Sequence, residues 1–125
     1  MKIMAVGDAY VFGLGIKNIY PQEENFRIKF RVVDAKATSG GLSNLVTTDE
    51  TIDGWLARNR FGVITIPNMG EKIVPIIVEV GPKVSVTQDT VTGTYTFEIL
   101  VEYEKTSQFW DRYDAAEHLL AIKVR

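Results

Sequence analysis

The sequence predicts a mainly β domain, either a β-barrel or a β-sandwich built as an antiparallel meander, with two short helices. Residues 26–32 alternate apolar and basic side chains, and residues 95–104 alternate, more loosely, apolar and acidic ones. Successive side chains on a strand point to opposite faces, so each run buries one face and exposes charge on the other. Short apolar runs separated by glycine and proline turns fill much of the remaining chain, a pattern typical of all-β architectures.

The size and composition of the chain fit one β-rich domain over residues 1–125. Hydrophobic residues make up 46% and charged residues 24%, which is ordinary for a protein that buries its own core. The formal net charge of −2 offers no positive excess, so we expect no nucleic-acid binding. The chain has no cysteine, which excludes disulfides and thiolate metal sites. We expect neither a secretory signal nor contact with a membrane, because no apolar run approaches the ~20 residues that span a bilayer.

The first 48 residues predict strands followed by a loop. Glycines and prolines break residues 1–25 into one or two short strands, and residues 26–34 predict a longer strand with its apolar side chains facing inward. From 35 to 48 the chain becomes small and polar, which predicts a long exposed loop. This loop carries Leu42, Leu45 and Val46, and apolar residues on a loop indicate contact with a partner. The alternative is that they fold back onto the domain's own core.

The middle of the chain predicts a helix and two strands. Residues 49–60 have an acidic start and apolar residues at helical spacing, so we expect a short helix anchored on the sheet by Trp55. Residues 63–66 and 72–80 predict strands on either side of a turn at residues 67–70. The second strand is apolar on both faces, which predicts cover on both sides, and Pro75 within it marks an edge or a bulge.

The last third of the chain predicts two further strands and a second helix. Residues 83–88 form a short strand, residues 89–93 a turn, and residues 94–104 the long acidic strand. Ser107 suits the cap of a helix from residue 108 to about residue 120. The tail, residues 121–125, alternates and predicts a short final strand.

The two charged strands are the main candidates for an interface. Their stripes either pair side by side within one sheet, or they meet between neighbouring copies and set the register of an assembly. Pro75 is a further candidate, because it marks its apolar strand as an edge strand. Such a strand is an aggregation hazard unless another chain covers it. The candidate interface residues are Arg27, Lys29, Arg31, Leu42, Leu45, Val46, Pro75, Glu98, Glu102 and Glu104.

No group of residues forms a recognised catalytic or metal-binding motif. His118 is the only histidine and lies in no triad pattern. Glu98, Glu102 and Glu104 recur at about 7 Å per step of two residues along a strand, so a pair of carboxylates for glycoside hydrolysis stays open. The solvated face of a strand is the simpler interpretation. We expect no catalytic residue, no metal, no cofactor and no enzymatic activity.

The aromatic residues near the second predicted helix allow two interpretations. Tyr103, Phe109, Trp110 and Tyr113 either belong to the core or form a platform that contacts a sugar or another protein. Trp110 and Tyr113 do not both lie on the helical stripe of Phe109, so one of them is expected to be half-exposed.

The order of parts between Trp55 and Glu102 resembles a known family. A helix that carries Trp55 and ends at residues 58–62 is followed by the strand 63–66, the turn Pro67-Asn68-Met69, the aliphatic strand 73–80 and, later, Phe97-Glu98-Ile99. This order resembles the N-terminal β-barrel of distal-tail and baseplate proteins in tailed phages and related contractile machines. The resemblance implies a ring-forming virion component that joins the tail tube to neighbouring proteins, without enzymatic activity or cofactor.

We therefore expect a non-enzymatic structural protein of a tailed-phage virion: a tail, baseplate or neck subunit. Its partners would be further copies of itself and other virion structural proteins. Its location would be the virion, assembled in the host cytoplasm. The alternative is a stand-alone β-domain that binds a carbohydrate or a peptide through the region of Trp110 and Tyr113.

Overall fold

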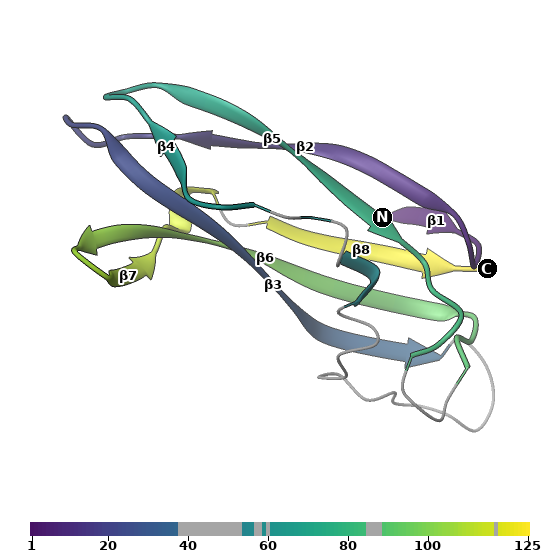
Figure 1. Ribbon diagram of the computed structural model, residues 1–125. Helices are drawn as coiled ribbons and strands as arrows, with labels where there is room; N and C mark the ends of the chain where they lie inside the picture. Colours follow the sequence, from purple (N-terminus) through teal and green to yellow (C-terminus); the bar gives the residue numbers. More distant parts are fainter. Residues whose placement is uncertain (38–53, 57–58, 60, 85–88, 117) are drawn as a thin grey trace.

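The computed structural model describes residues 1–37, 54–56, 59, 61–84, 89–116 and 118–125, and most of them lie in β-strands (Figure 1). The mainly β fold class is therefore confirmed. The elements in chain order are β1 (Lys2–Met4), β2 (Ala9–Lys17), β3 (Glu24–Ala37), η1 (Gly54–Leu56), β4 (Ile64–Ile66), β5 (Glu71–Glu79), β6 (Gly93–Thr106), β7 (Phe109–Arg112), η2 (Asp114–Ala116) and β8 (His118–Val124).

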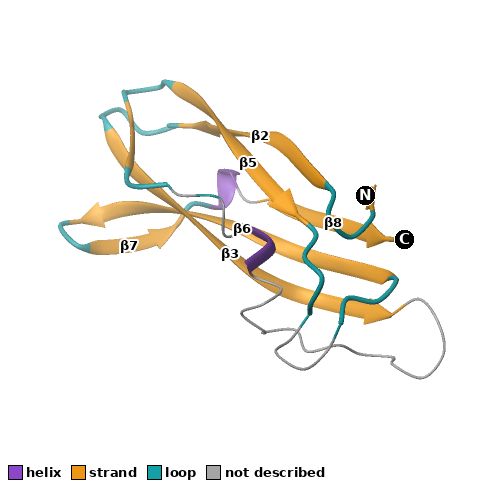
Figure 2. Cartoon of the chain, turned by 45° about the vertical axis from the view of Figure 1, so that its right-hand side comes forward, coloured by secondary structure: helices purple, strands orange, loops and turns teal. Residues whose placement is uncertain are grey.

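The described strands form two sheets that share one core. Sheet A has the order β1-β8-β6-β3-β4, with β7 added to β6, and sheet B consists of β2 and β5. Sheet A curls like half of a barrel, and Figure 2 shows sheet B as a separate layer beside it. Every pairing is antiparallel except that of β1 with β8, which is parallel.

The expected meander is wrong. Among the described strands, the pairs β3–β4 and β6–β7 are neighbours both in sequence and in a sheet, whereas β2 pairs with β5 and β3 pairs with β6. The chain therefore passes repeatedly from one sheet to the other. The hydrophobic pattern fixes which face of a strand is buried, but it does not choose the strand's partner.

The two expected helices are also wrong. Gly54–Leu56 and Asp114–Ala116 are single 3-10 turns, and most of the first predicted helix lies outside the described residues. Trp55 nevertheless anchors its turn, because its buried indole packs against Tyr95 and Phe97 and donates to the carbonyl of Lys83 at 3.3 Å.

Residues 108–116 and 118–120 form the turn into β7, the turn η2 and the start of β8 in place of the second helix. Gln108 has φ of 66° and turns the chain from β6 into β7, which leaves Phe109 exposed. In β8, Leu120, Ile122 and Val124 are buried at every second position. A period of two fits a strand, and the apolar spacing that suggested a helix comes from residues on three different elements.

The pairing of β3 with β6 builds the centre of sheet A. Both strands have 14 residues, and they confirm the predicted strands at residues 26–34 and 94–104. Phe26 and Val32 on β3 and Phe97 and Ile99 on β6 point into the core. Between Val32 and Asp34 the register shifts by one residue, a bulge that returns Ala35 to the buried face. β3 therefore continues into the first residues of the predicted loop, whose remainder lies outside the described residues.

Strand β5 confirms the predicted strand at residues 72–80 but not its cover on both faces. Val74, Ile76 and Val78 are buried against sheet A, whereas Ile73 and Pro75 on the opposite face are exposed. The predicted turn before β5 is present, with the N–H of Gly70 bonded to the carbonyl of Pro67 at 2.9 Å. The predicted strand at residues 83–88 lies mostly outside the described part of the chain.

A buried asparagine fastens the end of β2. Asn18 is fully buried, and its Nδ2 donates to the carbonyls of Gln22, Ile66 and Pro67 at 2.8, 3.1 and 3.2 Å. Its Oδ1 accepts from the N–H of Tyr20 at 2.9 Å. One side chain thus satisfies four backbone groups from two segments, residues 20–22 and 66–67, and each of these groups would be costly to leave unpaired.

We expect Asn18→Ala to lower the unfolding free energy by about 2–4 kcal/mol, because it leaves several buried polar groups unpaired. Chemical denaturation checks this. Asn25→Ala is the matched control, since Asn25 is only half-buried, and it should cost less than about 1 kcal/mol. Equal losses in the two variants would contradict the role given to Asn18.

Three tyrosines meet beside Asn18, and their contacts predict a response to alkaline pH. A hydrogen bond with Tyr103, followed by burial and by the nearby Tyr113 and Glu24, raises the pKa of Tyr20 to about 12. The protonated phenol therefore stabilises the fold fully below about pH 10, the ordinary tyrosine pKa, and this contribution is lost as the pH rises through the pKa of the folded state.

Ultraviolet titration of tyrosinate should show Tyr20 ionising late, and the unfolding free energy should fall as the pH rises above about 10. Tyr103→Phe removes the largest cause of the shift, so it should move the late step toward ordinary values. An unchanged titration curve in that variant would contradict the assignment.

Candidate functional site

The two charged stripes face each other within one chain. In the β3–β6 register, Arg27 lies opposite Glu102 and Arg31 lies opposite Glu98, and all four side chains are on the outer face of sheet A. Of the two arrangements that the sequence left open, the structure therefore has the pairing inside one sheet. Arg27, Lys29, Arg31, Glu98, Glu102 and Arg112 together are called the charged face.

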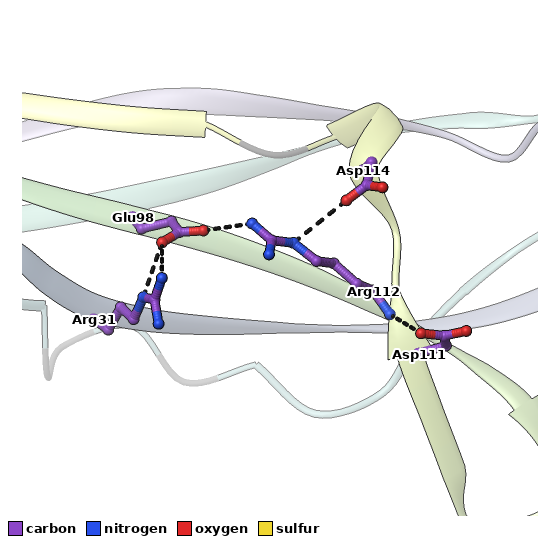
Figure 3. Close-up of polar contacts among 5 residues, drawn as sticks. All are labelled: Arg31, Glu98, Asp111, Arg112 and Asp114. Carbon is purple, nitrogen blue, oxygen red and sulfur yellow. Dashed lines mark hydrogen bonds and ion pairs between the residues drawn. The ribbon is translucent and has the colours of Figure 1, made fainter.

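Glu98 is the centre of the larger ion cluster (Figure 3). Its Oε2 accepts from Nε and Nη2 of Arg31 at 2.8 and 2.7 Å, and its Oε1 accepts from Nη2 of Arg112 at 2.7 Å. Arg112 also lies 3.3 Å from Oδ1 of Asp114 through its Nε. The side chain of Glu98 is only 10% exposed, so both carboxylate oxygens are occupied in a partly desolvated place where charged hydrogen bonds are strong.

Glu102 forms a second cluster one step along β6. Its Oε1 lies 2.8 Å from Nε of Arg27 and 3.3 Å from Nζ of Lys29. Burial alone would raise the pKa of Glu102, but the hydrogen bonds and charges of Arg27 and Lys29 outweigh it and hold this pKa below its ordinary value. The guanidinium of Arg27 also stacks over the ring of Trp110, with Cζ 4.5 Å from the centroid.

Glu104 belongs to neither cluster. Its Oε1 accepts from Nδ2 of Asn25 at 3.3 Å, so this residue, predicted together with the other two glutamates, has an amide partner on β3. Asn25 in turn accepts from the hydroxyl of Thr65 on β4 at 2.7 Å. The acidic stripe thus ends at a carboxylate that is linked through the amide of Asn25 to Thr65 on the edge strand β4.

Two shallow hollows open on the charged face. One, of about 430 Å³, is lined by Arg31, Glu98, Arg112, His118 and Leu119. The other, of about 230 Å³, is lined by Lys29, Arg31, Leu100, Glu102 and Arg112. They share Arg31 and Arg112. Each combines cationic head groups with one leucine, and the Leu119 side chain is largely exposed, so the surface offers charge and apolar contact side by side.

Arg112 was not a predicted site residue, and Trp110 was expected only in an aromatic platform, not beside the charged stripes. The sequence placed them on a helix, whereas both lie on β7, which pairs with β6 beside Glu102 and Glu104. A period-two reading of Phe109–Arg112 would have been the signal, but four residues are too few to separate a strand from a helix by pattern.

The remaining predicted residues lie elsewhere. Leu42, Leu45 and Val46 are outside the described residues. Pro75 lies on β5, opposite Gly13 of β2, on the outer face of sheet B. It therefore takes no part in the charged face, which belongs to the other sheet.

The aromatic platform proposed around Trp110 and Tyr113 is not formed. Tyr113 is buried, packs against Phe26 with ring centroids 4.9 Å apart, and donates its hydroxyl proton to the carbonyl of Lys17. Trp110 is half-exposed, and Arg27 covers one face of its ring. The tyrosine thus belongs to the core, and the tryptophan to the edge of the charged face.

Within the described part of the chain, no three His, Cys, Asp or Glu residues come close enough together to hold a metal ion. No helix within those same residues is long and apolar enough to cross a membrane.

We expect Glu98→Gln to lower the unfolding free energy by about 1–3 kcal/mol, since two guanidinium groups lose their common anion in a partly buried site. Thermal and chemical denaturation measure this. Glu104→Gln, which removes no ion pair among the described contacts, should stay within about 0.5 kcal/mol of the wild type. A larger loss for Glu104→Gln than for Glu98→Gln would contradict the central place of Glu98 in the ion cluster.

Comparison with known proteins identifies a structural neighbour. No family model and no curated protein sequence matches the chain. Among solved structures it is similar to the ASH/PapD-like domain of human CEP192 (PapD-like domain 7), with a TM-score of 0.59 and 11% identity over 99% of this chain and 81% of that chain. Such a domain is an immunoglobulin-like sandwich, so the resemblance to the β-barrel of phage distal-tail proteins is wrong. At this identity the likeness establishes the fold alone: the chain has the architecture of a PapD-like β-sandwich.

Proposed function

We propose that this chain is a non-enzymatic protein-interaction domain that binds an acidic, partly apolar segment of another protein on its charged face. The observation that carries the proposal is that the cationic side chains there are held in place and are still exposed to solvent. Glu98 and Glu102 hold them in place, yet the side chains of Lys29, Arg31 and Arg112 are 54%, 60% and 51% exposed. These groups are fixed in position and still reach solvent.

Such fixed cations suit the recognition of carboxylates. A guanidinium carries five N–H donors, and Glu98 is the partner that Arg31 contacts among the described residues, through Nε and Nη2. The donors that point to solvent can pair with a carboxylate of a partner. Because Glu98 already restricts the rotamers of Arg31, binding loses less side-chain entropy than it would with a free arginine.

The two leucines explain the apolar part of the proposed ligand. Leu119 lies opposite Glu98 in the β6–β8 register, and Leu100 lies between Glu98 and Glu102 on β6. An apolar side chain of the partner resting on these leucines would exclude water from the neighbouring ion pairs, which strengthens them.

Only part of the function expected from the sequence is retained. The virion role, the virion partners and the virion location depended on the resemblance to phage tail proteins, which the PapD-like architecture replaces. A binding role without catalysis is retained, and so is the peptide ligand of the alternative. The sugar ligand is not, because its aromatic platform is absent from the described residues around Trp110.

A random peptide library displayed on yeast tests this proposal. We expect enrichment of segments that combine Asp or Glu with Leu, Ile or Phe. In fluorescence polarisation, Arg31→Gln and Leu119→Ser should each weaken an enriched peptide at least about fivefold, or roughly 1 kcal/mol. Binding should also weaken as salt is raised.

Ile73→Ser is the matched control, since Ile73 is an exposed aliphatic residue on sheet B. It should leave the affinity unchanged. A library without enriched binders, or binders that tolerate both Arg31→Gln and Leu119→Ser, would reject the proposal.

A further inference from the structure

Along one edge of sheet B, the edge of β2 that faces away from β5, backbone N–H and C=O groups have no hydrogen-bond partner among the described residues. Asn59 donates from Nδ2 to the carbonyl of Ile77 at 2.6 Å and accepts from its N–H at 2.7 Å, so the polar groups of Ile77 point away from β2. Val11 lies directly opposite Ile77. In an antiparallel pair, opposite residues either exchange both hydrogen bonds or both point away from each other. The N–H and C=O of Val11 therefore point to the far side of β2.

At every second residue of β2, the backbone N–H and C=O groups point away from β5 in the same way. Gly13 and Gly15 follow Val11 in this alternation, and Pro75, opposite Gly13, has no N–H to exchange. Among the described residues, no hydrogen bond reaches the N–H or C=O of these three residues from the far side. All three are exposed. The first strand of the chain does not cover this edge, because β1 pairs with β8 in sheet A.

The free edge of β2 has a defined end. At Lys17 the backbone carbonyl accepts the hydroxyl proton of Tyr113, so it is already occupied. The open stretch thus runs along the odd-numbered residues from Ala9 to Gly15. No proline, charged side chain or bulge interrupts that stretch, although these are the usual devices that keep an exposed edge from pairing.

We propose that two copies of this chain pair edge to edge through β2, antiparallel, with a two-fold axis at Gly13. The two copies of sheet B then form one four-stranded sheet in the order β5-β2-β2-β5. In this register Gly13 faces Gly13 of the second copy, and Val11 faces Gly15 of the second copy. The three pairs formed by residues 11, 13 and 15 exchange six backbone hydrogen bonds.

The side chains of β2 fit this register. On the outer face, Val11 lies opposite a glycine, and Ala9 lies opposite the long side chain of Lys17, so each larger residue meets a small one. On the inner face, Phe12 is only half-buried and meets Leu14 of the second copy. The pattern of large and small residues is complementary to itself about Gly13, which favours a second copy over an unrelated strand.

Gly13 at the axis also has a local reason. A Cβ at this position would lie 2.7 Å from Cγ2 of Ile73, so the side chain of Ile73 occupies the space on the outer face where a larger residue would stand. At Gly15 the nearest atom to an added Cβ is Oε1 of Glu71 at 3.5 Å, an ordinary contact. Substitutions at Gly15 are therefore suitable probes, and substitutions at Gly13 are not.

Sedimentation and light scattering over a range of concentrations test the pairing. We expect the wild type to form a dimer of twice the 14.0 kDa chain mass. Val11→Pro and Gly15→Pro each remove an N–H that points to the free edge and no bond to β5, so they should weaken the dimer at least about tenfold. Val11→Ala and Gly15→Ala keep the N–H and should dimerise like the wild type.

Disulfide trapping tests the register without depending on the proline variants. The chain has no cysteine, and positions 11 and 15 of one chain are about 13 Å apart, too far for a bond between them. In the proposed dimer each faces the other position of the second copy at about 5.5 Å. Oxidation of the double variant Val11→Cys/Gly15→Cys should therefore give a covalent dimer, and the two single variants should not.

A wild type that stays monomeric at every concentration overturns the pairing. So does a dimer that both proline variants leave unchanged, or single cysteine variants that cross-link as fast as the double variant. The charged face lies on sheet A and the free edge on sheet B, so peptide binding and dimerisation can each fail without the other.

Discussion

The antiparallel pairing of β3 with β6 is the constraint on which the other features depend. It places Phe26, Val32, Phe97 and Ile99 in the core and, on the opposite face, brings each glutamate to its arginine. A shift of one residue in this register would exchange the two faces of the strand, burying charge and exposing aromatic rings. The hydrophobic core and the ion pairs therefore select the same register, and the geometry of the charged face follows from it.

The sequence predicted those parts of the fold whose residue pattern is compatible with one kind of secondary structure only. Strict alternation identified β3, and a looser alternation over a longer run identified β6. Trp55 was recognised as an anchor because it lies among apolar residues at helical spacing, although the segment forms a 3-10 turn. The charged stripes were found from the alternation in β3 and β6. Whether they met within one chain was undetermined, because alternation specifies a face and not a partner.

The parts that were missed depend on contacts far apart in sequence. Residues 108–120 have apolar spacing that fits a helix, and only pairing with β6 makes them β7 and β8. The sequence left Tyr113 open between the core and a contact platform, and what places it in the core is its position beside Phe26 and its hydrogen bond to Lys17, a residue 96 positions earlier. The family resemblance failed in a related way, since a helix followed by strands is common to many β folds, and the order of strands in the sheets is what distinguishes them.

The bulge at Val33 sets which side chains of the second half of β3 face the core. Before it, even-numbered residues face the core, and after it Ala35 takes the inward position while Asp34 stays half-exposed. If the same residues formed a regular strand without the bulge, strict alternation would carry the carboxylate of Asp34 into the apolar interior. The length of this strand and its bulge are therefore coupled: deletion of Val33 alone would leave a regular strand with Asp34 outside and Ala35 inside, whereas deletion of both Val33 and Asp34 would turn Ala35 to the outer face.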